Sequence, residues 1–293
     1  MATSVKTIAI RKPDDWHVHL RDGTMLKAVL SFTAKRFGRA IVMPNLAPNP
    51  VITTEDVRAY RKRIDEVAKD FPSFTPLMTY YLTDNSSPED IAQGFKKGTA
   101  AAVKVYPAGA TTNSALGVTG IQKVYPVFEM MQKIRMPLLL HGETVTKDGV
   151  EVAPMDREKV FLDSSLPKLL KDFPELKIVL EHATTKNAVD FVRNEKSPRL
   201  ASTITIHHLM VNRMDVEHTN KQAYFHCTPI IKNEEDQKAL RQATTSGEPY
   251  FFLGTDSAPH TISAKEKVPP AMGVFTAPAA LEFYAQIFEE EGK

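Results

Sequence analysis

Short apolar runs alternate with amphipathic stretches along almost the whole chain. Each run is nearly continuous rather than alternating with polar residues, which is typical of parallel strands covered on both faces. We therefore predict eight strands, at residues 15–20, 40–44, 76–82, 101–106, 137–141, 177–181, 201–207 and 250–255.

The stretches between these runs predict helices with recognisable ends. Residues 54–70 carry their apolar side chains on one helical stripe. Ser87 and Pro88 mark the start of a helix that Gly98 should end, and Pro126 should kink or shorten a helix at 121–134. Further helices are expected at 156–172, 186–194, 234–243 and 277–290. Eight alternations of strand and helix without a linker predict an α/β fold, a (β/α)₈ TIM barrel forming one domain over residues 1–293.

Composition narrows the class of protein. The 293 residues carry a net charge of +2, and Lys and Arg are not clustered, so we expect no nucleic-acid partner. The only cysteine, Cys227, cannot form an internal disulfide, which favours a reducing compartment. The N-terminus lacks a signal-peptide pattern, and no apolar run approaches the ~18–20 residues of a membrane span. We therefore expect a cytoplasmic protein without a membrane partner.

Polar side chains end seven of the eight predicted strands, which is where such barrels carry their chemistry. They are His17 with His19, Asn45, Lys104, His141, His182, His207 with His208, and Asp256. His17 and His19 share one face of a strand because side chains alternate with a period of two. An isolated pair could simply be hydrogen-bonded near a loop, but the other strand-end histidines and Asp256 favour a zinc site.

Lys104 lies inside an apolar strand, where an unpaired ammonium would be strongly destabilising. One interpretation is an ion pair with Glu143 or Glu181. The other is that burial lowers the pKa of Lys104 and the neutral amine takes up CO₂. The product is a carbamate, a carboxylate on a long stem that can bridge two metal ions.

Four histidines, this lysine and Asp256 could together hold two zinc ions ~3.5–4 Å apart, which would activate a water near neutral pH. His207 and His208 are not needed for this set, and we expect them to have structural or supporting roles. Cys227 is expected to be a small packed residue rather than a nucleophile.

Six segments carry a resemblance to a known family: DDWHVHLRDG, GRAIVMPNL, KVYPAGATTNS, PLLLHGE, LEHATT and FLGTDSAPH. They closely resemble the shorter, bacterial-type dihydroorotases of the amidohydrolase superfamily, from about residue 13 to residue 288. The HxH motif alone marks the superfamily, and the segments with Arg21, MPN and TTNS narrow it to dihydroorotase. The resemblance implies zinc-dependent, reversible hydrolysis of (S)-dihydroorotate to N-carbamoyl-L-aspartate in de novo pyrimidine (UMP) biosynthesis.

The resemblance also implies a role for each matched residue. The first zinc would be bound by His17, His19 and Asp256, the second by His141 and His182, and N6-carboxylated Lys104 would bridge the two. Asp256 would also be the catalytic acid and base. The implied substrate contacts are His19, Arg21, Asn45, Thr111, Thr112, His141, Thr228, His260 and Met272. Arg21, Asn45 and His260 would hold the substrate carboxylate, Thr111 and Thr112 belong to a mobile loop, and the family expectation is a homodimer.

Two departures from the family pattern stand out. Thr228 and residues 269–273 differ in their side chains from the usual ring contacts, so we expect those contacts to come from the backbone. The chain ends at Lys293, whereas related proteins continue through a C-terminal segment, which is compatible with a truncated form, fragment or isoform.

Two other functions compete with dihydroorotase. A hydantoinase, an allantoinase or an enzyme for a dihydropyrimidine would act on a neutral ring, which would leave the predicted carboxylate contacts Arg21 and Asn45 without a partner. A catalytically silent barrel acting as a scaffold is the second alternative, but this chain keeps all six metal ligands.

Overall fold

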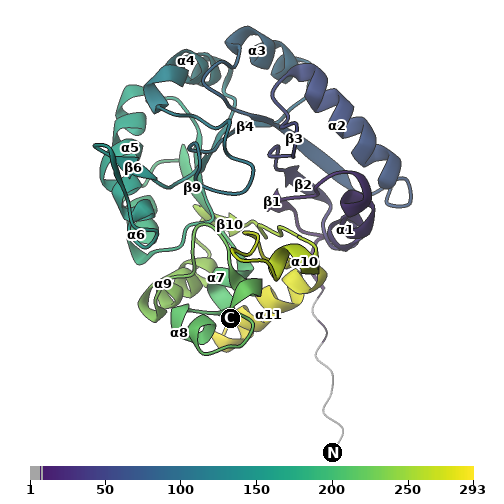
Figure 1. Ribbon diagram of the computed structural model, residues 1–293, viewed down its shortest axis with the longest axis vertical. Coiled ribbons are helices and arrows are strands. Elements are labelled where there is room, and N and C mark those ends of the chain that lie inside the picture. Colours follow the sequence, from purple (N-terminus) through teal and green to yellow (C-terminus); the bar gives the residue numbers. More distant parts are fainter. Residues whose placement is uncertain (1–6, 8) are drawn as a thin grey trace, which may run out of the picture.

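The computed structural model describes residue 7 and residues 9–293. Eight parallel strands form a barrel in the order β1-β2-β3-β4-β5-β8-β9-β10 (Figure 1), which confirms the predicted fold class. Every strand overlaps its predicted run. The strands are β1 Asp15–Val18, β2 Arg39–Val42, β3 Thr75–Tyr81, β4 Ala102–Val105, β5 Leu138–His141, β8 Ile178–Glu181, β9 Leu200–Ile204 and β10 Phe251–Leu253.

Hydrogen bonds just beyond β10 close the barrel against β1. The amide of Asp256 donates to the carbonyl of His17 at 2.9 Å, and the amide of His19 donates to the carbonyl of Ser257 at 3.0 Å. The backbone amide and hydroxyl of Thr255 donate to the two carboxylate oxygens of buried Asp15, at 2.9 and 2.7 Å. This seam brings the first and last predicted metal ligands together.

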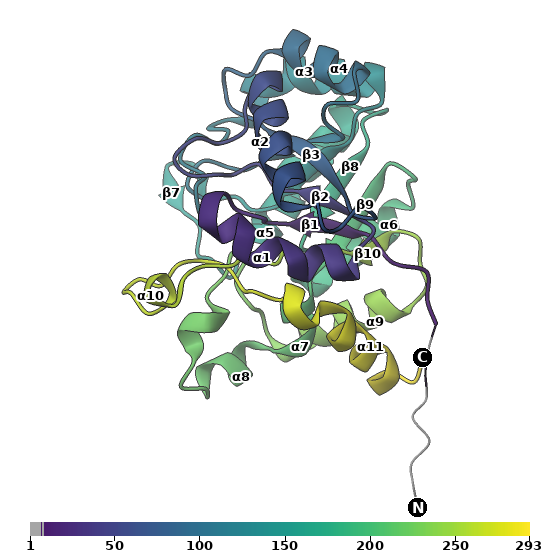
Figure 2. The same ribbon diagram turned by 90° about the vertical axis from the view of Figure 1, so that its right-hand side faces the viewer.

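Helices surround the strands, and one small hairpin lies outside the barrel sheet (Figure 1). The helices are α1 Gly23–Arg36, α2 Thr54–Val67, α3 Pro88–Lys96, α4 Tyr125–Ile134, α5 Arg157–Asp172, α6 Lys186–Glu195, α7 Ile206–Met210, α8 Arg213–Glu217, α9 Glu234–Thr245, α10 Ile262–Lys265 and α11 Ala280–Glu290. Shorter elements are the 3₁₀ turns η1 Ile121–Val124, η2 Gln222–Phe225 and η3 Ala277–Ala279, and the hairpin β6 Thr146–Lys147 with β7 Val150–Glu151. Helices α1 and α11 lie on the same outer side (Figure 2), where Arg36 pairs with Glu282 at 3.1 Å.

The main apolar core lies between sheet and helices, and a smaller cluster of Ile41, Met43, Ala102 and Leu139 is separate from it. Among the residues that the structure describes, no helix combines the length and hydrophobicity needed to cross a bilayer. The sequence pattern at the N-terminus predicted no signal peptide. Residues 1–6 and 8 of that stretch lie outside the described part of the chain.

The residues that were predicted to start, end or shorten helices do so in α3 and α4. The hydroxyl of Ser87 accepts from the amide of Asp90 at 3.2 Å, Pro88 is the first residue of α3, and Gly98 follows its end with a φ of +68°. Pro126 is the second residue of α4, and η1 precedes it as a separate turn, so the helix is shortened as predicted.

One predicted strand is wrong in its second half. The run at 201–207 forms β9 only as far as Ile204, and Ile206 begins the short helix α7. His207 and His208 therefore lie on a helix rather than at a strand end. The hydroxyl of Thr205 lies 2.6 Å from Nδ1 of His208, a local polar contact that a reading of apolar runs does not detect.

Candidate active site

A small polar cavity lies at the carboxyl ends of the strands and collects most of the predicted site residues. These are His17, His19, Arg21, Asn45, Thr111, Thr112, His141, His182, Thr228, Asp256 and Met272. Lys104 and His260 are absent from its lining, but His260 contacts Arg21 and the Lys104 amine lies 5.0 Å from the ring of Tyr106, which lines the cavity.

The first three ligand atoms have the spacing of a single metal site. Nε2 of His17 lies 3.4 Å from Nε2 of His19 and 3.2 Å from Oδ1 of Asp256, and that oxygen lies 3.1 Å from Nε2 of His19. A tetrahedral zinc with bonds of 2.0–2.1 Å separates its ligand atoms by about 3.3–3.4 Å. The three ligand atoms therefore have the mutual spacing that one tetrahedral metal ion requires.

A second pair has the same spacing. Nδ1 of His141 lies 3.2 Å from Nε2 of His182, and both rings are buried. Ligand atoms of His17, His182 and Asp256 also lie within 4.8 Å of one another, so the two groups are adjacent. Burial lowers the pKa of His141 and His182, which keeps both imidazoles neutral and able to bind a metal.

Buried carboxylates stand behind these histidines. Nε2 of His141 lies 2.7 Å from Oε2 of Glu143, and Nδ1 of His17 lies 3.1 Å from Oε1 of Glu181. The first contact is an aligned hydrogen bond, whereas the second is a close approach whose N–H does not point along it. Carboxylates behind histidine ligands fix the ring tautomer in metal sites.

Lys104 is fully buried, with 0% of its surface exposed, and its amine contacts Oε2 of Glu181. This is one of the two ion pairs left open by the sequence, while Glu143 contacts His141 instead. Burial lowers the pKa of Lys104 to about 7, and the nearby carboxylate of Asp256 opposes that shift. A neutral amine is therefore accessible at physiological pH.

Arg21 and His260 form a polar wall of the cavity. Nε2 of His260 lies 2.8 Å from the carbonyl of Met272 and 3.0 Å from a guanidinium nitrogen of Arg21. A carbonyl only accepts, so Nε2 carries the hydrogen and cannot also accept one from Arg21. Burial lowers the pKa of His260 to about 4, so the ring is neutral. Nη2 of Arg21 is thus left with a donor for another acceptor.

The loop that carries Thr111 and Thr112 is packed over the cavity. Nδ2 of Asn45 donates to the carbonyl of Thr112 at 3.0 Å, and the hydroxyl of Thr112 donates to the carbonyl of Met272 at 3.1 Å. The enclosed volume is about 20 Å³, far below the ~300 Å³ of ordinary small-molecule sites. In this structure the loop leaves little free space in the cavity.

Three site residues adopt left-handed backbone conformations. The φ angles of Arg21, His182 and Asp256 are +57°, +42° and +44°. Such conformations cost about 1–3 kcal/mol for residues other than glycine and concentrate at functional sites. They turn the chain sharply where the strands end and aim the side chains into the cavity.

Tyr106 lines the cavity and has no role in the sequence-based prediction. It is 2% exposed, and its hydroxyl has no hydrogen-bond partner within the described part of the chain. Its spacing of two residues from Lys104 was the available signal, because residues two apart on a strand share a face. Ala258 and Cys227 also line the cavity without having been predicted to, whereas Gly273, another lining residue, belongs to the segment 269–273 that was expected to contact the ring.

His207, His208 and Cys227 form another buried group with ligand atoms within 4.8 Å of one another. Nδ1 of His208 lies 2.6 Å from the hydroxyl of Thr205, and Nε2 lies 3.1 Å from the carbonyl of Pro229, so both ring nitrogens are in use. Burial raises the pKa of Cys227 to about 12, which keeps it a thiol. These contacts agree with the packed, structural roles expected for His208 and Cys227.

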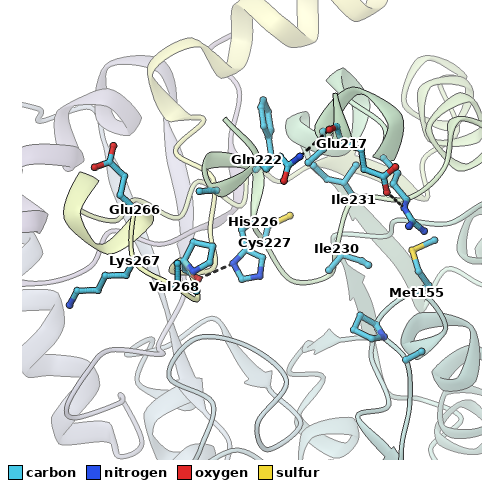
Figure 3. Close-up of a pocket in the computed structure, with 17 residues that line it drawn as sticks. Met155, Glu217, Gln222, His226, Cys227, Ile230, Ile231, Glu266, Lys267 and Val268 are labelled. Atoms are coloured by element: carbon cyan, nitrogen blue, oxygen red, sulfur yellow. Dashed lines mark hydrogen bonds and ion pairs between the residues drawn. The ribbon is translucent and has the colours of Figure 1, made fainter. Parts of the chain in front are cut away.

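A larger cavity, of about 690 Å³, lies next to the polar one and shares Cys227 with it (Figure 3). Its walls are mostly apolar and include Met155, Ile230, Ile231 and Val268. The larger volume is therefore not where the candidate chemistry lies, because the histidine pairs and Asp256 line the small cavity.

The chain was compared with family models and with curated proteins. No family model matches the chain. The chain is 51% identical over 286 residues to a dihydroorotase from Nitrosococcus oceani, covering 98% of this chain and 81% of the relative. It is 52% identical over 284 residues to a dihydroorotase from Parasynechococcus marenigrum, covering 97% and 81%.

Solved structures agree. A dihydroorotase from Saccharomyces cerevisiae in complex with 5-fluoroorotic acid superposes with a TM-score of 0.88 at 37% identity, covering 96% of this chain and 79% of that one. A Campylobacter jejuni dihydroorotase gives 0.84 at 39% identity, with 95% and 77% covered. An L-hydantoinase from Arthrobacter aurescens, with a TM-score of 0.77, 15% identity and coverage of 93% and 64%, shares the fold alone. With relatives about half identical over nearly its whole length, the chain belongs to the dihydroorotase family of cyclic amide hydrolases.

Proposed function

We propose that this enzyme reversibly hydrolyses (S)-dihydroorotate to N-carbamoyl-L-aspartate in de novo pyrimidine biosynthesis. The observation that carries the proposal is the position of Arg21, whose guanidinium borders the same cavity as the two histidine groups. A cation next to a hydrolytic centre fits a cyclic amide that bears a carboxylate. The 5-fluoroorotic acid bound by the yeast relative is an acid of this kind.

The ligand atoms described above support a site for two zinc ions. His17, His19 and Asp256 would hold the first ion, and His141 with His182 the second. When bound, such a pair supplies Lewis acidity at the amide carbonyl and lowers the pKa of the attacking water toward ~7.

Lys104, carboxylated at N6, would support the pair as a bridge. Burial, which lowers its pKa to about 7, leaves the amine able to take up CO₂. In this step the amine would form a bond to the carbon of CO₂ and release one proton. The carbamate nitrogen would keep one hydrogen, for which Oε2 of Glu181, the atom that contacts the Lys104 amine, would be the acceptor. The contact with Glu181 is therefore compatible with carboxylation as well as with an ion pair.

Asp256 would transfer a proton from the attacking water to the ring nitrogen. Burial raises its pKa, but the adjacent imidazoles of His17 and His19 more than offset this and hold the pKa well below its usual range. The ionised carboxylate can take a proton from the attacking water and deliver it to the ring nitrogen as the amide bond breaks. In the reverse direction Asp256 removes that proton and the ring closes.

The polar wall would orient the substrate. Nη2 of Arg21 can donate to the substrate carboxylate, with Asn45 and neutral His260 beside it. Thr228 and Met272 border the space for the ring, and the hydroxyl of Thr228 donates to the sulfur of Met272 at 2.7 Å. This contact ties both side chains to each other, which favours backbone groups as the ring contacts.

The loop at Thr111 and Thr112 would act as a lid. A cavity of about 20 Å³ cannot admit the substrate, so the contacts of Thr112 with Asn45 and Met272 have to break for entry. Gly109, with a φ of +76°, gives the loop a position of high backbone freedom. Lid closure would then exclude water during the reaction.

Other features of the proposal rest on the sequence. The single cysteine favours the cytoplasm, the barrel would be a single domain, and the family resemblance favours a homodimer.

The experiment that tests the proposal compares two substrates. Metal-replete protein should turn over dihydroorotate, followed spectrophotometrically, at a kcat/KM at least about 10²-fold above that for hydantoin, because only dihydroorotate offers Arg21 a carboxylate. Equal turnover of the two compounds, or a preference for hydantoin, would reject dihydroorotate as the substrate.

A further inference from the structure

Lys265, the last residue of α10, is a buried lysine that the proposed reaction does not use. Only 5% of its surface is exposed. Its amine donates to three backbone carbonyls, those of His226 at 3.1 Å and of Ala271 and Gly273 at 2.8 Å each. An ammonium has three hydrogens, so its donor capacity is completely used.

The three carbonyls belong to two chain segments that border the substrate cavity. His226 precedes Cys227 and Thr228, and Ala271 and Gly273 flank Met272. Figure 3 shows His226 and Cys227 at the neighbouring apolar cavity, so the segment they belong to forms a wall between the two spaces.

The carbonyl groups of the second segment point alternately to opposite sides. The carbonyls of residues 271 and 273 accept from Lys265, whereas the carbonyl of Met272 accepts from Thr112 and His260 at the active site. Gly273 has a φ of +147°, and a Cβ there would lie 2.5 Å from the carbonyl oxygen of Ala258. The segment is thus confined to one path, with Lys265 on one side and the substrate cavity on the other.

The two segments also bond directly to each other, but at few points. The amide of Gly273 donates to the carbonyl of His226 at 2.8 Å, and Nδ1 of His226 lies 2.8 Å from the carbonyl of Pro270. Without the ammonium, the part-buried carbonyl of Ala271 and the buried carbonyl of Gly273 lose the donor that the structure gives them, and an unpaired buried carbonyl is destabilising. Burial lowers the pKa of Lys265 to about 8, so the charged donor persists at neutral pH.

We propose that Lys265 is a positioning residue for the substrate ring, whose ammonium holds the segments of Thr228 and Met272 in register with each other. This inference rests on the proposed function, because those two residues are ring contacts only for that substrate. Lys265 contacts none of the proposed metal ligands, so its effect should be separate from metal binding.

The test compares Lys265→Met with Lys265→Arg and with the matched control Lys267→Met, which alters an exposed lysine two residues away. Methionine keeps the length of the side chain but donates nothing, and a planar guanidinium cannot converge on three carbonyls as an ammonium does. We expect both Lys265 variants to raise the KM for dihydroorotate about 10- to 100-fold, with unchanged zinc content and a smaller change in kcat. Lys267→Met should behave like the unaltered enzyme.

Hydrogen–deuterium exchange separates this inference from the proposed function. Faster amide exchange in residues 226–229 and 269–273 of the Lys265 variants, and not of the Lys267 variant, is expected whether or not dihydroorotate is the substrate. Unchanged exchange in those segments would overturn the inference, as would faster exchange with an unchanged KM. Absence of dihydroorotate turnover in the unaltered enzyme would instead overturn the proposed function. Lys265→Arg keeps the charge, so it carries the test if the methionine variant does not fold.

Discussion

His141 donates from Nε2 to Oε2 of Glu143 across 2.7 Å, and both side chains are buried. This bond fixes the tautomer of the imidazole and leaves Nδ1, which faces His182, free to bind a metal. The carboxylate thus acts on the metal site through the ring that it orients.

Replacing Glu143 by glutamine should therefore weaken metal binding. The amide is nearly the same size but has no charge, and loss of such a partner typically costs about 10- to 100-fold in metal affinity. Zinc titration of metal-free protein would measure the change, with Glu175→Gln, an exposed glutamate, as the control. A Glu143 variant that binds zinc as tightly as the control would show that the contact does not orient a ligand.

Carboxylation of Lys104 should depend on pH in a defined range. Only the neutral amine reacts with CO₂, and burial, which brings the pKa of Lys104 to about 7, makes about one tenth of it neutral at pH 6 and about nine tenths at pH 8. Reactivation of metal-free protein by zinc at constant dissolved CO₂ should therefore accelerate between pH 6 and 8 and level off above. A rate that still rises tenfold between pH 8 and 9 would indicate an ordinary lysine.

Removing the charge of Arg21 should affect substrates selectively. In Arg21→Met, kcat/KM for dihydroorotate should fall about 10- to 10²-fold, because a charged hydrogen bond contributes roughly 1.5–3 kcal/mol. Turnover of hydantoin, which has no carboxylate, should change little. Equal losses on both compounds would mean that Arg21 supports the cavity rather than the substrate.

Tyr106→Phe removes a buried hydroxyl that has no partner among the described residues. Stability should not decrease, since an unpaired hydroxyl contributes no hydrogen bond to the folded state. If the hydroxyl faces bound substrate, the KM for dihydroorotate should rise about 3- to 10-fold. Thermal unfolding and steady-state kinetics give the two readouts, and a lowered Tm with an unchanged KM would assign Tyr106 to packing alone.

Much of the fold follows from the sequence because the barrel strands are nearly continuous apolar runs. The strand-end rule then brings His17, His19, His141, His182 and Asp256 to one cavity, as their positions in the chain predict. The prediction failed for the apolar run at 201–207. Thr205 and His208 bond locally, and the strand ends at Ile204.

Other parts of the site depend on tertiary contacts that no local pattern encodes. The left-handed conformation of His182 and the choice of Glu181 over Glu143 as the contact of Lys104 arise only when separate strands meet. The same is true of Lys265, whose amine is bonded to the carbonyl of His226, 39 residues away, as well as to those of Ala271 and Gly273.

The most direct test of the account measures zinc content and dihydroorotate turnover in one gently purified sample, before and after chelation. We predict two zinc ions per chain and a turnover that disappears with the chelator and returns when zinc and bicarbonate are added. Full turnover in chelated protein that holds less than one zinc per chain would contradict the account.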